Sequence, residues 1–330
     1  MYQRRYAPQS RPRPPESSGG LLFLASIFAV VGSLLVGYVA LEKMTELRIV
    51  VGLDQAARQM AEKVDFKYRN VRVSLWERAI RINGISLKAP NERDALRIDR
   101  VTVSELDWET IFRVAQTGGA PTIPRTIRMG VHGVHLTPRM LGAKPASFMK
   151  QLGYDEISLS LSTGFLFDRR KNIFGVDGMT IEVADMGRLK FSFQLGNVRM
   201  PTDGELLALK TNPDGPKPEP PDMKDATLRS AEISYHDLSL LGRIDQMLKN
   251  EGKPGLADLV QIGTRMPASA GGQFIADAVE KVNKFVSAPE QSIRISSQPL
   301  EPLPLDSLGL EVLLGPDKLA KKLNLQIDVN

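Results

Sequence analysis

This 330-residue sequence contains three histidines and no cysteine. The histidines are therefore its only imidazole ligands or nucleophiles, and the chain has no thiol. His132 and His135 lie on either side of Gly133. Side chains three residues apart in a regular strand point to opposite faces, although a bulge at the glycine could bring them together. The pair lacks a third ligand nearby, so we predict no metal site.

The remaining histidine, His236, follows Tyr235 and precedes Asp237 at the end of a predicted strand. An acid–base role for His236 and Asp237 stays open, but a turn that ends the strand is the simpler interpretation. The run 168–172 (DRRKN) lies between two predicted strands. We interpret it as a solvated hairpin tip, with contact to anionic head groups as the alternative.

Catalytic sequence motifs are missing from the chain. It has no Walker A sequence, no G-x-S-x-G nucleophile elbow, no H-E-x-x-H and no dinucleotide-binding glycine fingerprint after a strand. We therefore predict that the protein is not an enzyme, with no catalytic residue, no cofactor and no bound metal.

The element that must position everything else is an apolar run at residues 21–41, LLFLASIFAVVGSLLVGYVAL. Its 21 residues carry no charge, and as a helix they would extend about 30 Å, the thickness of a bilayer's hydrocarbon core. The run predicts a single transmembrane helix. The alternative is a cleaved signal peptide, which typically has a shorter apolar region and a better small-x-small cleavage sequence.

The tail before this run, residues 1–20, carries four arginines and one glutamate. Positive charge favours the cytoplasmic side. We expect a cytoplasmic basic tail, a single-pass anchor in a bacterial inner membrane, and a periplasmic C-terminal part. The tail supplies +3 of the net charge of +5, and the small remainder argues against nucleic-acid binding. The lack of cysteine fits a periplasmic domain.

Small side chains recur at every fourth residue of the apolar run, at Ala25, Ala29, Ser33 and Gly37. Such a face lets two membrane helices approach closely. It predicts self-association or docking on a partner helix; the alternative is coincidence, because small residues are common in membrane helices.

After the anchor, apolar residues at steps of three and four predict a juxtamembrane helix over 42–65. We expect its apolar stripe to pack on the domain core, with a membrane-surface role as the alternative. From residue 66 the period changes to two, which predicts sheet strands with one apolar and one polar face. We expect one β-rich domain over 66–330, with a Pro-rich exposed loop at 201–224 and helices in its C-terminal third.

A short pattern, apolar-x-Gly-apolar-x-apolar, occurs three times, around Gly84, Gly133 and Gly178. A weaker copy with alanine in place of glycine starts at Ala231. Glycine inside a strand indicates a bulge, and an inserted residue lets apolar side chains on both sides of it face one core. The repeat predicts a curved, mostly antiparallel sheet in an α+β fold; unrelated bulges are the alternative.

The chain resembles the AsmA/TamB-like bacterial envelope proteins, in particular a short inner-membrane YdgA-like relative. Besides the N-terminal anchor, the resemblance rests on four stretches: 73–90 (VSLWERAIRINGISLKAP), 95–108 (ALRIDRVTVSELDW), 231–252 (AEISYHDLSLLGRIDQMLKNEG) and 295–330, with its Pro-spaced leucines, short helix and closing strand. It implies a periplasmic, β-rich, elongated sheet. Larger members are thought to guide phospholipids along an apolar groove, but this chain is much shorter.

Together these features predict a non-enzymatic, membrane-anchored envelope protein that binds membrane lipid or a partner protein, in outer-envelope maintenance or lipid trafficking. The alternative is a scaffold subunit of an inner-membrane complex, which docks on a membrane protein or on a second copy through its transmembrane helix. A sheet with an open apolar face would favour lipid; a face covered by helices would favour a partner protein.

Overall fold

The computed structural model describes residues 41–55, 57–58, 61, 64–89, 94–105, 125–199, 223, 225–263, 272–288, 290–307 and 315–330. Every structural statement below concerns these residues. Two predicted features lie outside them: the apolar run before Leu41, and the loop 201–224 apart from residue 223.

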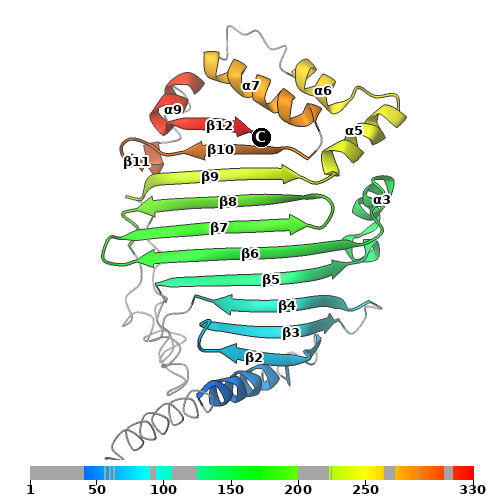
Figure 1. Cartoon of the computed structure of the whole chain (residues 1–330), viewed down its shortest axis with the longest axis vertical. Helices are drawn as coiled ribbons and strands as arrows, with labels where there is room; N and C mark the ends of the chain where they lie inside the picture. Colours follow the sequence, from blue (N-terminus) through cyan, green and yellow to red (C-terminus); the bar gives the residue numbers. More distant parts are fainter. Residues whose placement is uncertain are drawn as a thin grey trace, which may run out of the picture.

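One sheet of 12 strands organises the molecule (Figure 1). Its main path is β1-β3-β4-β5-β6-β7-β8-β9-β10-β12, with β2 also paired to β3 and β11 to β9. All of these pairs are antiparallel. The strands are β1 (Asp65–Lys67), β2 (Asn70–Ser74), β3 (Ala79–Lys88), β4 (Leu96–Ser104), β5 (Thr126–Leu136), β6 (Ile157–Asp168), β7 (Ile173–Val183), β8 (Gly187–Gly196), β9 (Thr227–Asp237), β10 (Ser292–Ser297), β11 (Leu303–Pro304) and β12 (Leu325–Val329).

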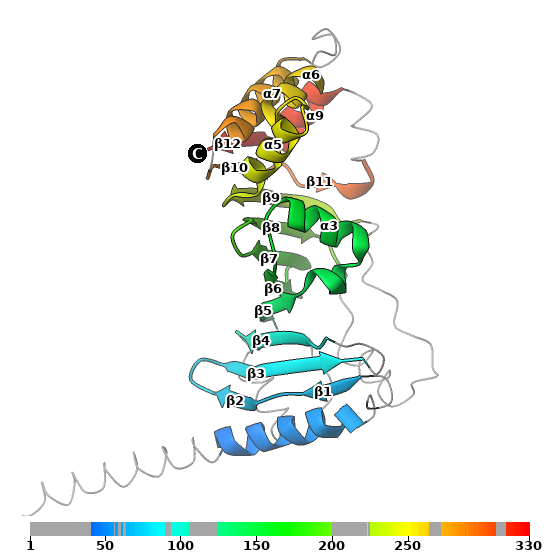
Figure 2. The same ribbon diagram turned by 90° about the vertical axis from the view of Figure 1, so that its right-hand side faces the viewer.

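Helices lie at the ends of this sheet. A helix over residues 41–55 runs beneath β2, and the remaining helices gather beside β5–β6 and above β10 (Figures 1 and 2). They are η1 (Pro138–Leu141), α3 (Ala143–Gln151), α5 (Leu240–Asn250), α6 (Leu256–Gly263), α7 (Gly272–Ser287) and α9 (Pro316–Leu323). The fold is therefore α+β, with an open antiparallel sheet.

The helix that the sequence predicts over 42–65 is shorter in the structure. Residues 41–55, 57 and 58 are helical, residue 61 lies in a turn, and β1 already begins at Asp65. The apolar spacing continues through this stretch, so periodicity alone overestimates the length of the helix. Among the described residues, no helix combines the length and the apolar composition that crossing a membrane requires.

Two of the repeat glycines lie at shifts in strand register. The pairing of β5 with β6 shifts between Val131 and Val134, around Gly133. The pairing of β7 with both neighbours shifts around Gly178. Both glycines have positive φ, 63° and 67°, a conformation that side chains disfavour. An extra residue in one strand thus keeps the apolar residues before and after each glycine on one face.

Gly84 behaves differently from the other two, although its φ is also positive at 64°. The pairing of β3 with β4 stays in one register on both sides of it, from Ile80↔Val103 to Leu87↔Leu96. The reason is that β4 has a matching irregularity opposite Gly84. Its residues Ile98 and Val101 are three apart in the sequence, yet both face the apolar side of the sheet. At the weaker fourth copy, Ala231 pairs regularly with Phe193, and the register shift lies earlier in β9, between Ser230 and Leu228.

Candidate functional site: the apolar face of the sheet

A row of apolar side chains crosses the whole sheet. Ten strands each contribute one residue, and every neighbouring pair in the row is in register. The members of this central row are Val71, Ile82, Val101, Val131, Leu161, Ile181, Leu189, Tyr235, Ile293 and Val329. Since side chains alternate between the faces of a strand, the row defines one apolar face of the sheet.

Next to the central row, four large apolar side chains remain in contact with solvent. Met129 is 40% exposed, Phe191 36%, Ile233 42% and Ile295 37%. Each lies two residues along its strand from that strand's member of the central row, and all four lie on the same flank of that row. Phe191, Ile233 and Ile295 are also direct register partners. We call these four residues the floor row. Singly exposed apolar residues are common, but an aligned set is a feature that calls for an explanation.

Phenylalanines border the floor row toward one end of the strands. Consecutive ring centroids lie 6.2 Å apart for Phe165 and Phe167, 5.4 Å for Phe167 and Phe174, and 5.7 Å for Phe174 and Phe193. Phe193 also lies 5.4 Å from Phe191. Offset and tilted ring pairs of this kind are favourable, so they stabilise the packing of this border.

Packed clusters close the apolar face around its open middle. At one end of the strands, Leu152, Tyr154, Ile157 and Met186 form a buried cluster with side chains of α3 and α5. At the other end, Leu195, Val198 and Ala226 are buried. The clusters at the two strand ends leave the floor row between them uncovered.

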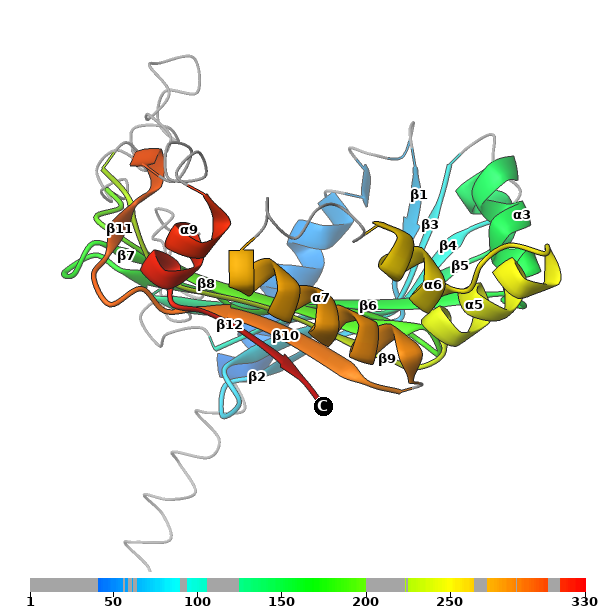
Figure 3. The same cartoon turned by 90° about the horizontal axis from the view of Figure 1, so that it is seen from above.

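The first and last strands of the apolar face are covered by helices. Toward the C-terminal edge of the sheet, Phe285 of α7 packs edge-on against Tyr235 of β9, with ring centroids 6.0 Å apart, and Ile327 of β12 is buried. Near β2, Leu75 packs with Leu41 of the N-terminal helix. Figure 3 shows α3, α7 and α9 on one side of the sheet. Packed side chains therefore border the described part of the apolar face, and the floor row on β5, β8, β9 and β10 stays in contact with solvent; we call this bordered region the apolar basin.

The opposite face of the sheet is polar, and charged neighbours pair across it. Arg188 contacts Glu182 at 2.8 Å and Arg294 contacts Glu232 at 2.6 Å. Arg128 joins Glu105 at 2.8 Å to Asp177 at 3.2 Å. The hydrogen bond to Glu105 is the largest of the contacts that raise the pKa of Arg128.

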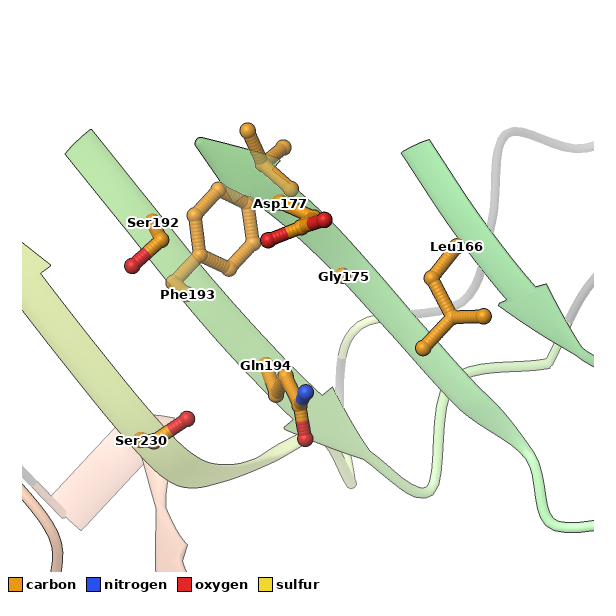
Figure 4. Close-up of a pocket in the computed structure, with 8 residues that line it drawn as sticks. Leu166, Gly175, Asp177, Ser192, Phe193, Gln194 and Ser230 are labelled. Carbon is orange, nitrogen blue, oxygen red and sulfur yellow. The ribbon is translucent and has the colours of Figure 1, made fainter. Parts of the chain in front are cut away.

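A small hollow on this polar face lies over Gly175, where a missing side chain leaves space between Leu166, Gln194 and Ser230 (Figure 4). The hollow is also lined by Val176, Asp177, Ser192 and Phe193, so the Asp177 carboxylate is the one ionisable group among its eight lining residues. They present no set of converging ionisable groups for catalysis.

The bulge at Gly133 places His132 and His135 on the polar face together, because their register partners are Arg100 and Arg97. The described residues contain no cluster of ligands suited to a metal ion. Instead, His135 contacts Asp99 at 3.2 Å and Glu156 at 3.1 Å. The hydrogen bond to Asp99, followed by that to Glu156, raises the pKa of His135.

Tyr235 and Asp237 form part of a structural cluster at the end of β9. The buried carboxylate of Asp237 accepts hydrogen bonds from the Tyr235 hydroxyl at 3.1 Å and from the backbone N–H of Leu241 at 3.0 Å. Burial is the main cause that raises the pKa of Tyr235. The bond to Leu241 ties the first turn of α5 to the sheet, as a capping side chain does. His236 lies on the polar face, opposite Ser292.

The sequence predicted the register shifts at Gly133 and Gly178, but it predicted one at Gly84 that is not seen, and it did not reveal the alignment of the floor row. The alternation of Phe191 and Phe193, and of Ile233 and Tyr235, was visible in the sequence, whereas the register that brings these residues together was not. The predicted contact face of the anchor, at Ala25, Ala29, Ser33 and Gly37, lies outside the described residues.

Comparison with known proteins adds little to this geometry. No curated protein matches the chain. A family model described as an uncharacterized protein matches residues 180–330. That segment begins within β7 and includes Phe191, Ile233 and Ile295 of the floor row. Over its C-terminal strands and helices the chain is thus similar to that family, in the part that holds most of the open apolar face.

Proposed function

We propose that this chain is a non-enzymatic, membrane-anchored envelope protein of the AsmA/TamB-like kind, whose open apolar basin binds an acyl chain of a membrane lipid. The observation that carries this proposal is the floor row, Met129, Phe191, Ile233 and Ile295, aligned and exposed at the centre of the sheet. In this proposal residues 21–41 anchor the chain in a bacterial inner membrane, with the sheet on the periplasmic side.

The length of the floor row fits this ligand. From Met129 on β5 to Ile295 on β10 it spans six neighbouring strands, and the five spacings between them, at about 4.8 Å each, amount to about 24 Å. One leaflet accounts for about 15 Å of a bilayer's hydrocarbon core. A single acyl chain can therefore lie across the strands within the open part of the basin.

The thermodynamics of such binding would suit transfer better than storage. An acyl chain in a bilayer is already out of water, so its movement onto an apolar protein surface gains little hydrophobic free energy. Binding would, in contrast, remove the floor row from contact with water. We therefore expect reversible binding, which a role in lipid trafficking requires.

The test is photo-crosslinking of the full-length protein in membranes. A photoreactive phenylalanine analogue in place of Phe191 should form an adduct with phospholipid, detectable by mass spectrometry. The matched control replaces Lys190, its exposed neighbour on the polar face of β8. If position 191 yields no lipid adduct, or no more than position 190, the lipid-binding proposal is wrong.

The same experiment addresses the scaffold alternative. A protein adduct at position 191 in place of lipid would show that the basin accommodates a partner. The anchor's own docking role is tested separately, by replacing Ser33 and Gly37 with leucine. Loss of a detergent-stable complex would support that role, and unchanged co-purification would count against it.

A further inference from the structure

The N-terminal helix, residues 41–55, exposes an apolar stripe on the side away from the sheet. Met44 is 55% exposed, Leu47 65% and Val51 64%. Their spacing of three and four residues places them along one line of the helix surface. This stripe is separate from the floor row, which lies on β5–β10.

The opposite side of the same helix contacts the sheet near the start of the helix, and a further contact lies near its end. Near its start, Leu41 packs against the buried Leu75, whose backbone N–H donates to Glu42 Oε1 at 3.1 Å. Near its end, the Tyr68 hydroxyl donates to Asp54 Oδ1 at 2.7 Å. The helix therefore cannot roll to bury the stripe without breaking these contacts.

A second exposed apolar group lies beside the start of the helix. Trp76 follows Leu75 in the turn between β2 and β3, and it is 86% exposed. Tryptophan is enriched where a protein meets the membrane–water interface, because its ring is amphipathic. Through Leu75 it is held near Leu41, the last residue of the apolar run 21–41.

We propose that the Met44–Leu47–Val51 stripe and Trp76 together bind the surface of a phospholipid bilayer. The occupant follows from position: the stripe begins three residues after an uncharged run of membrane-spanning length. Lys43 and Arg48 adjoin the stripe and suit lipid head groups. The inference rests on the proposed membrane anchoring and adds to it an orientation, with β2 nearest the bilayer and β12 farthest from it.

The test uses the full-length Trp108→Phe variant in phospholipid vesicles, which leaves Trp76 as the only tryptophan of the chain. Lipids brominated at shallow acyl positions should quench its fluorescence, and an aqueous quencher should reach it poorly. Adding Leu47→Glu and Val51→Glu should lower the docked population by about tenfold, because each change removes apolar burial. Quenching by the brominated lipids should fall accordingly.

A matched control is Ile262→Glu on α6, another apolar helix residue that is 53% exposed. It should leave the quenching of Trp76 unchanged. Resistance to alkaline extraction of the vesicles reports anchoring independently in every variant, and circular dichroism reports folding.

The outcomes separate the two proposals. If the chain resists alkaline extraction but Trp76 stays open to the aqueous quencher, the docked orientation is wrong and the anchoring stands. If the aqueous quencher is excluded but brominated lipids do not quench, the stripe binds protein or a second copy, and the inference is again wrong. If the chain is extracted as a peripheral protein, the proposed anchoring fails, and the orientation that rests on it fails too.

Discussion

On the polar face of the sheet, charged side chains meet partners of opposite charge, whereas on the apolar face the middle strands leave large side chains exposed to solvent. Arg294 lies against Glu232 on the first face, while Phe191 and Ile233 stand open on the second. A polar face with paired charges is satisfied within the chain. An exposed apolar row is not satisfied in this way, so the proposed ligand should be sought on that side.

The largest difference in unfolding free energy is expected between substitutions at a covered and at an open position of the apolar face. Leu75 is 2% exposed, and Leu75→Ala should lower the free energy of unfolding by about 3 kcal/mol through the cavity it leaves. Ile233→Ala, at an open position, should cost about 1 kcal/mol, because the side chain is partly hydrated already. Urea unfolding of the full chain in detergent measures both. Equal costs would mean that the floor row is in fact covered.

The next largest loss of stability is expected at Gly133, whose bulge keeps the apolar residues of β5 on one face of the sheet. A β-carbon there would lie 2.1 Å from Asp99 Oδ2 and 2.9 Å from its Cβ. Gly133→Ala should therefore cost about 2 kcal/mol, from the left-handed conformation and from displacement of Asp99. The control is Gly252→Ala, where φ is also positive but nothing lies within 4 Å; its cost should be about 1 kcal/mol. If the two substitutions lower the unfolding free energy equally, the contact with Asp99 does not contribute to the cost at Gly133.

A smaller effect is expected on the polar face. Arg294→Gln removes an ion pair whose arginine side chain is 53% exposed. Solvent and salt screen such pairs, so the unfolding free energy should fall by about 0.5 kcal/mol or less. Thermal unfolding at low and high salt measures it. A loss several times larger would show that this face depends on particular pairs rather than on general solvation.

The smallest effect is the pH dependence of His135. Its pKa is raised in the folded state above the ordinary value of 6.5, so its stabilising contribution is complete below that value. The contribution is lost as pH rises through the folded pKa. Asp99 and Glu156 face the ring, and Arg97 is its register partner on β4.

We expect the native chain to exceed His135→Gln in stability by about 0.5 kcal/mol or less near pH 5.5, since the side chain is partly exposed. The difference should shrink toward pH 8, as the imidazole loses its proton. Unfolding curves of both chains at the two pH values provide the measurement. A difference that grows toward alkaline pH would contradict the assigned contacts.

Much of the fold could be read from the sequence, because alternating residues such as Leu189, Phe191 and Phe193 have few other interpretations. The helices predicted in the C-terminal third are present as α5, α6, α7 and α9. The exact register was beyond reach, because alternation excludes a slip of one residue but not a shift of two, which keeps every side chain on its face. Gly84 and Gly133 illustrate the limit: the same local pattern gives a register shift in β5 but not in β3, because the neighbouring strand decides.

The central row runs across the strands rather than along them, so the number of strands determines the reach of the molecule. Ten strands lie on the main path of the sheet, and at about 4.8 Å each they separate its ends by at most about 43 Å. A hairpin inserted into the sheet would lengthen the molecule by about 10 Å while leaving the width of the basin unchanged. Chains built in this way can change how far they extend simply by gaining or losing hairpins.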